Sequence, residues 1–138
     1  MNHYVKWHGR MVWLGILVNM IFVFPLFLVP NLFLGLLGIH IDQPIWARSA
    51  AMLLFIISVF YIPPTWDLKR YRASAWIAIF PSRTFGATFF TVAVLVFGFP
   101  VGFLSIAVVD AFFGLTTLYF LLQVTKAEKA AGEPVSLR

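Results

Sequence analysis

The sequence has no cysteine and few charged residues. Without cysteine, disulfides, thiolate metal sites and cysteine nucleophiles are excluded. Charged residues form 11% of the chain and hydrophobic residues 62%, with a mean hydropathy of +0.94, whereas an ordinary soluble domain has roughly 25% charged residues. We therefore expect an all-α integral membrane protein, and the length of 138 residues suits a single membrane domain over residues 1–138.

Four apolar runs can each form a transmembrane helix. They cover residues 11–29, 47–62, 75–99 and 101–124 and are separated by proline, glycine or charged residues. About 20 apolar residues are needed to cross a hydrocarbon core of about 30 Å, so the second run is the shortest candidate. After Pro30 comes a stretch too short to cross, NLFLGLLGI, which predicts a short interfacial helix. The sequence thus predicts a bundle of four transmembrane helices and a polar tail at residues 125–138.

Basic residues gather on one side of these four spans. Arg48 alone lies near the opposite surface, and eight bases share the first side: Lys6, Arg10, Lys69, Arg70, Arg72, Lys126, Lys129 and Arg138. Basic residues in short loops favour the cytoplasmic side, so we expect both termini in the cytoplasm of a multi-pass protein of the bacterial inner membrane. This flanking role accounts for the net charge of +5, and no nucleic-acid partner is predicted.

Arg83 is a permanently charged residue inside the third run, in the stretch PSRTFGATFF. If the helix begins near Ser74 with Trp76 at headgroup level, Arg83 lies about 10 Å deeper, at about 1.5 Å per residue. If Pro81 begins the helix instead, the side chain would extend back to the inner surface. We favour the deeper placement, because the preceding segment AWIAIF is too apolar to lie in water.

Asp110 is a second charge, near the middle of the fourth run and about 15 Å below the outer surface. A tight turn joins the third and fourth runs, so their helices must be antiparallel neighbours with Arg83 and Asp110 at similar depth. We predict a buried ion pair, with Asn19 of the first run as a third polar group beside it. Small and polar residues at three- and four-residue spacing mark the facing stripes, Ala107, Asp110, Gly114 and Thr117 on one helix and Arg83, Ala87 and Thr91 on the other.

Two roles for Arg83, Asp110 and Asn19 are open at this point. They can form a structural clamp that fixes which helices pair. They can also form a proton relay, or a polar site for a quinone, lipid or substrate headgroup. Because charges of opposite sign can satisfy each other, we favour the clamp. No cofactor is predicted, although a quinone or lipid fits the second role.

A basic cluster, KRYR, lies outside the spans and contains Lys69, Arg70 and Arg72. It is a candidate site for anionic lipid headgroups, because each basic residue near the surface contributes about 1 kcal/mol of attraction. The role of these basic residues in setting the membrane topology already accounts for the presence of the cluster.

The three histidines do not suggest a metal centre. His40 falls on the opposite side of the membrane from His3 and His8, which argues against haem or di-iron ligation within the bundle. His40 and Asp42 could share a metal, but this spacing in a turn is common by chance, and a solvated loop is favoured. Phosphate-binding glycine loops, serine nucleophile elbows and paired catalytic carboxylates are missing from the sequence. We therefore predict no catalytic, cofactor or metal residues.

Three features occur in order along the chain: a proline-broken first span leading into LFLGLLGI, the basic KRYR loop, and two tightly linked closing spans. In this outline the sequence resembles small bacterial four-helix membrane proteins of DoxX-like organisation. The resemblance implies an accessory role beside redox enzymes.

We expect a non-enzymatic protein that serves as an accessory or stabilising subunit of a larger inner-membrane complex. Its partners would be the lipid bilayer together with other membrane subunits or further copies of itself. The alternative is a transporter or a lipid- or quinone-binding protein that uses Arg83, Asp110 and Asn19. An enzyme acting on lipid at the inner surface is the least favoured function.

Overall fold

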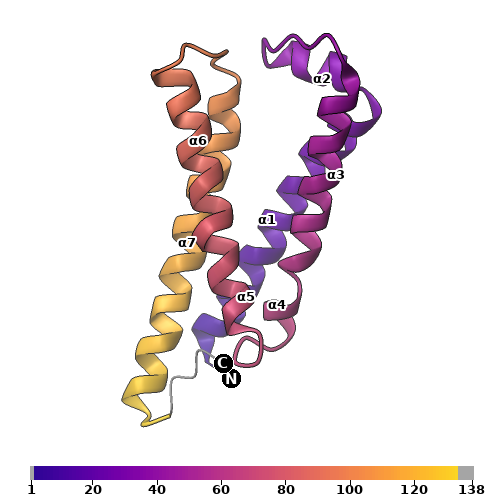
Figure 1. Ribbon diagram of the computed structural model, residues 1–138. Coiled ribbons are helices and arrows are strands. Elements are labelled where there is room, and N and C mark those ends of the chain that lie inside the picture. Colours follow the sequence, from indigo (N-terminus) through magenta and orange to yellow (C-terminus); the bar gives the residue numbers. More distant parts are fainter. Residues whose placement is uncertain (1, 134–138) are drawn as a thin grey trace.

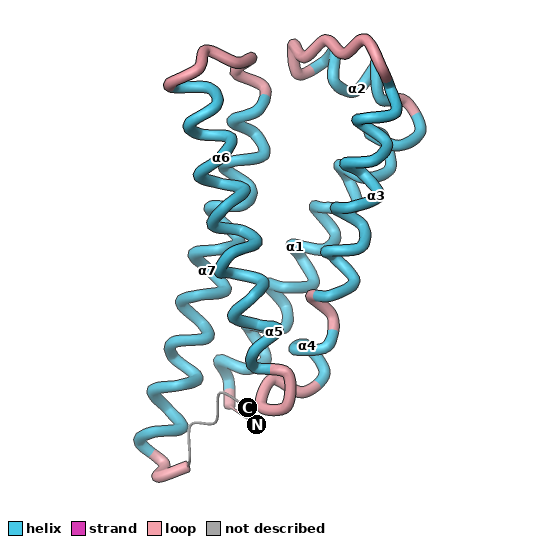
Figure 2. Tube along the Cα trace, viewed as in Figure 1, coloured by secondary structure: helices cyan, strands magenta, loops and turns pink. Residues whose placement is uncertain are grey.

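All secondary-structure elements in the described residues, 2–133, of the computed structural model are helices (Figures 1 and 2). In chain order the helices are α1 (His3–Leu28), α2 (Pro30–Leu36), α3 (Pro44–Phe60), α4 (Pro63–Trp66), α5 (Arg72–Ile77), η1 (Ala78–Arg83), α6 (Thr84–Leu95) and α7 (Phe103–Ala130). Loops lie towards the two ends of the molecule (Figure 2).

Four helical stretches are long and apolar enough to cross a membrane. They are His3–Leu28, Pro44–Trp66, Arg72–Leu95 and Phe103–Ala130. This confirms the prediction of an all-helical chain with four candidate spans. The fourth extends past its predicted end into the first residues of the expected polar tail, because its buried face continues through Val124 to Glu128. Residues 134–138 of that tail lie outside the described part of the chain.

The predicted short helix after the first span is present as α2. Pro30 is its first residue, a position where the missing N–H of proline costs nothing. Gly38 ends the turn with a φ of 71°, a left-handed conformation that glycine adopts without strain. The N–H of Ile39 then donates to the carbonyl of Leu34 at 2.8 Å, which satisfies a carbonyl freed at the helix end.

The four spans pack in the order α3, α1, α7, α6. Helix α1 lies between α3 and α7, and α7 lies between α1 and α6. Figure 1 places α2 and the α6–α7 loop at one end of the molecule and the α4–α5 connection at the other. At this second end, which we call the inner end, a core cluster joins three elements and the loop before α5: Leu68, Ala75, Ile79, Leu121 and Val124. None of the residues of α6 is fully buried.

The third span is interrupted at Phe80. Its backbone has φ −121° and ψ 109°, outside the helical region. A residue before proline is pushed out of the helical conformation because the Pro81 ring crowds it. The span therefore begins as a helix at Arg72, and a second helical segment begins at Pro81 after the break. The two alternative starts predicted from the sequence, near Ser74 and at Pro81, each correspond to one of these segments. The carbonyl of Ile79, next to the break, accepts hydrogen bonds from both the backbone N–H and the hydroxyl of Thr84, the latter at 2.9 Å.

Four crossings make a testable prediction about sidedness. Because the natural chain has no cysteine, single cysteines can be placed without background. We call the end of the molecule opposite the inner end the outer end. We expect His40→Cys and Phe99→Cys, both at exposed positions of the outer end, to react with an impermeant maleimide applied to intact cells. Lys69→Cys should react only after the membrane is permeabilised. Labelling of Lys69→Cys and His40→Cys from the same side would contradict an odd number of crossings between them.

Candidate functional site

Arg83 joins all four spans through one chain of hydrogen bonds. Its Nη1 donates to Asp110 Oδ1 of α7 at 2.7 Å and to Asn19 Oδ1 of α1 at 3.2 Å. Asn19 Nδ2 in turn donates to Ser58 Oγ of α3 at 2.9 Å. The structure thus brings the three predicted residues together and adds Ser58, whose own hydroxyl donates to the carbonyl of Leu54. Ser58 was not predicted, because a lone serine in an apolar run has no distinguishing pattern.

The guanidinium of Arg83 lies inside the protein. Arg83 is 6% exposed and Asn19 3%, while the Asp110 side chain is 17% exposed. The guanidinium carbon lies 5.2 Å from the ring centre of Tyr61 and 5.6 Å from that of Phe113, close enough for cation–π attraction. The alternative in which Arg83 extends back to the inner surface is therefore wrong, because every contact of its guanidinium lies within the helix bundle.

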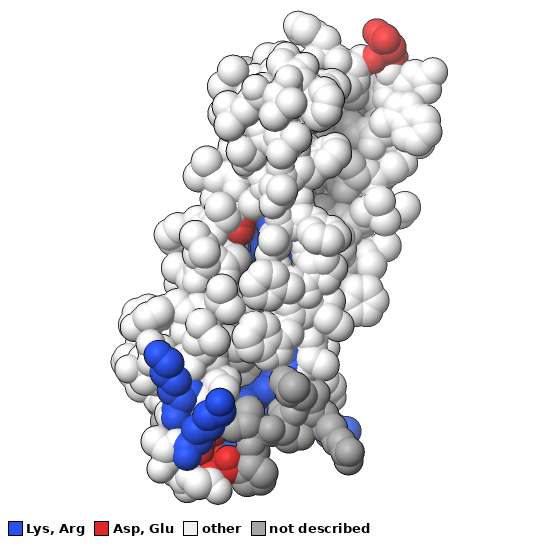
Figure 3. Space-filling view, turned by 60° about the vertical axis from the view of Figure 1, so that its left-hand side comes forward, with Lys and Arg blue, Asp and Glu red and all other residues white. Residues whose placement is uncertain are grey.

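Figure 3 shows how the charges are distributed over one face of the molecule. Lysine and arginine side chains gather at the inner end, acidic side chains appear at both ends, and a small blue and red area lies midway along the molecule. The exposed charges of the inner end can be solvated, whereas the charges at mid-height depend on their protein partners.

Three glycines make room for the pair. A methyl group at Gly86 of α6 would lie 2.0 Å from Asp110 Oδ2. At Gly15 of α1 it would lie 3.1 Å from Arg83 Nη2, and at Gly114 of α7 it would lie 3.1 Å from Arg83 Cβ. Only Gly114 was part of the stripe predicted from the sequence. The other two could not be distinguished, because their importance comes from neighbours on different helices.

A second buried ion pair lies nearer the inner end. Arg72 donates through both terminal nitrogens to the two carboxylate oxygens of Glu128, each at 2.5 Å. Arg72 is 2% exposed, so its assignment to lipid headgroups is wrong: the guanidinium is held between helices by a bidentate carboxylate. Glu128 was assigned to the solvated tail, although it extends the α7 stripe at unbroken three- and four-residue spacing, through Thr117, Leu121, Val124 and Glu128.

The other two residues of the basic cluster are exposed. Lys69 forms an ion pair with Glu133, and the hydrogen bond to this carboxylate raises the pKa of the lysine. Arg70 lies over the ring of Tyr71, at 5.5 Å from its centre. Headgroup binding stays a prediction for Lys69 and Arg70.

The described residues offer no cluster of three or more histidine, aspartate or glutamate side chains suited to a metal ion. His3 and His40 are exposed, whereas His8 is 1% exposed. Comparisons with protein-family models, with curated proteins and with solved structures find no match to this chain. The function must therefore be inferred from the geometry of the site itself.

Gly86 provides a direct test of the close approach. We expect Gly86→Ala to displace Asp110 and to lower the melting temperature by several degrees. The added methyl group would lie 2.0 Å from Asp110 Oδ2, so either the short carboxylate side chain or the α6 backbone has to move. The matched control is Gly35→Ala on α2, where a methyl group would meet nothing within 4 Å. Thermal unfolding in mild detergent measures both, and equal melting temperatures would contradict the contact.

The two glutamates of the inner end give a second prediction. Glu128→Gln removes the partner of a buried arginine and should destabilise the protein by about 3 kcal/mol. Glu133→Gln breaks the exposed pair with Lys69 and should change the free energy of unfolding little, because water screens this pair. Denaturant unfolding of both variants compares the same chemical change at a buried and an exposed position. A larger effect at Glu133 would contradict the burial of the Arg72 pair.

Proposed function

We propose that this protein is a non-enzymatic accessory subunit that stabilises a larger inner-membrane complex through helix contacts. The single observation that carries the proposal is that each buried arginine is paired with a carboxylate inside the protein, with only Arg72 Nε lacking a hydrogen-bond partner among the described residues of these pairs. Arg83 bonds to Asp110 and Asn19, and Arg72 bonds to Glu128. Groups used in this way hold helices together, whereas a transport or ligand site needs polar atoms that can exchange partners.

The space beside the Arg83 pair supports the same function. The pocket next to it has a volume of about 20 Å³, close to what a single water molecule occupies. A quinone ring or lipid headgroup needs a site of hundreds of Å³. The transporter and quinone-binding alternative therefore requires the helices to separate around Arg83, at the cost of its hydrogen bonds.

The packing order supplies surfaces for partners. Helices α3 and α6 lie at the two edges of the row, and α6 has no fully buried residue. Large apolar side chains are exposed on both helices, among them Leu53, Phe60, Phe85 and Phe89. Such faces contact lipid in the isolated chain and helices of another subunit in a complex. The DoxX-like resemblance implies a redox enzyme as the partner, which agrees with an accessory role.

The proposal is tested by purifying the natural chain from its own membrane in mild detergent. We expect a membrane protein partner at fixed stoichiometry, identified by mass spectrometry, and loss of stability or assembly of that partner when the chain is deleted. A lone protein that carries a bound quinone or lipid would overturn the proposal in favour of the ligand-site alternative.

Asp110 distinguishes the clamp from a relay. Asp110→Asn leaves the Arg83 charge buried without a countercharge and should cost about 3 to 5 kcal/mol, whereas the double variant Arg83→Met with Asp110→Leu should recover most of that loss. Both are measured as thermal stability and as recovery of the partner on purification. A relay predicts the reverse pattern, with a well-folded Asp110→Asn protein that has lost activity and a double variant that regains none.

A further inference from the structure

Among the buried polar side chains outside the two ion pairs, one has a polar atom without a hydrogen-bond partner in the described part of the chain. His8 lies on α1 and is 1% exposed, and its Nδ1 has no hydrogen-bond partner among the described residues. A buried imidazole nitrogen without a partner loses its hydrogen bond to water and gains nothing in return. Its surroundings therefore need explanation.

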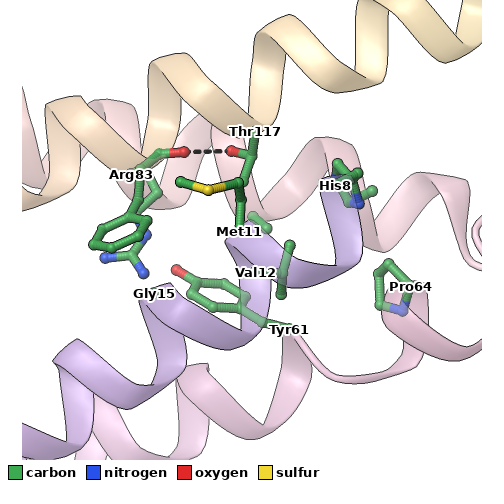
Figure 4. Close-up of a pocket in the computed structure, with 11 residues that line it drawn as sticks. His8, Met11, Val12, Gly15, Tyr61, Pro64, Arg83 and Thr117 are labelled. Carbon is green, nitrogen blue, oxygen red and sulfur yellow. Dashed lines mark hydrogen bonds between the residues drawn. The ribbon is translucent and has the colours of Figure 1, made fainter. Parts of the chain in front are cut away.

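His8 lines the same pocket that reaches Arg83. Figure 4 shows His8 at one end, the Arg83 guanidinium at the other, and Met11 and Thr117 between them. The pocket volume of about 20 Å³ exceeds the minimum of roughly 10 to 15 Å³ that one water molecule needs. The space is thus large enough for one water and too small for an organic ligand.

The polar atoms along this pocket are suited to binding such a water. The Thr117 hydroxyl donates to the carbonyl of Phe113 at 2.5 Å, so its oxygen is left as an acceptor. The two protein hydrogen bonds of Arg83 in the described residues both use Nη1, and the other terminal nitrogen, Nη2, lies close to Gly15, where a methyl group would approach it to 3.1 Å. A buried water typically makes two to four hydrogen bonds, and these groups can supply them.

We propose that the pocket between α1, α5, η1 and α7 is a binding site for one ordered water molecule, held by His8 Nδ1 and the Thr117 hydroxyl. The water satisfies the imidazole and extends the polar network of Arg83 towards the inner end of the molecule. It is a structural ligand of the fold, independent of the partner proposed above.

The sign of a stability change tests the site. If the pocket is hydrated, His8→Leu removes a satisfied group and lowers the melting temperature by about 3 to 5 °C. If the pocket is dry, the same change removes an unsatisfied polar group and raises the melting temperature. His3→Leu, at an exposed position of the same helix, is the control and should change it little. A rise for His8→Leu would overturn the proposal.

A second measurement detects the water in the natural chain itself, before any substitution is made. Solid-state NMR of the natural chain in lipid, with ¹⁵N-labelled histidine, reports transfer of magnetisation from bound water to the imidazole of His8. We expect a cross peak from a long-lived water at His8, weakened in Thr117→Val. An absent cross peak in the natural chain, or an unchanged one in Thr117→Val, would overturn the assignment.

Discussion

The fold depends on burying one guanidinium among its helices. A buried charged side chain is costly unless the protein replaces its hydration, and the surrounding helices contribute to that replacement. Asp110 supplies the countercharge, Asn19 a second acceptor, and the rings of Tyr61 and Phe113 two aromatic faces. The glycines beside the pair follow from the same need, because a larger residue would push the charges apart. Arg83 therefore dictates the contact faces of three helices.

The break at Phe80 separates two tasks along the third span. Before the break, Arg72 pairs with Glu128, and after it, Arg83 pairs with Asp110. Both acids belong to α7, which is continuous from Phe103 to Ala130. A sliding motion of α7 against the third span would break both pairs together, so they fix the register between the two helices. Apolar contacts alone specify register weakly in a membrane, since lipid tails are equally good apolar neighbours.

The helical class and the facing of Arg83 and Asp110 could be predicted from the sequence, because hydropathy and a tight connection leave few alternatives for where two charges lie. Glu128 was also accessible, since it continues the α7 stripe, but its polar sequence context led to its assignment to the tail. Arg72 was assigned to the headgroups for the same reason. Ser58, Gly15 and Gly86 were not accessible: their roles exist only once distant helices meet, and a single residue in an apolar run does not indicate its neighbours.

The buried polar groups along α1 distinguish the two halves of the bundle. His8 near the inner end and Asn19 farther along both lie on the buried face of this helix, and the pocket beside Gly15 lies between them. Buried polar groups on α1 therefore occur from the inner end up to the ion pair, among the apolar clusters of the same half. Beyond the pair, the outer cluster formed by Leu34, Ile39 and Ala47 is apolar. The inner half of the bundle thus combines apolar packing with buried polar groups, while the outer half relies on the packing of α2 and α3.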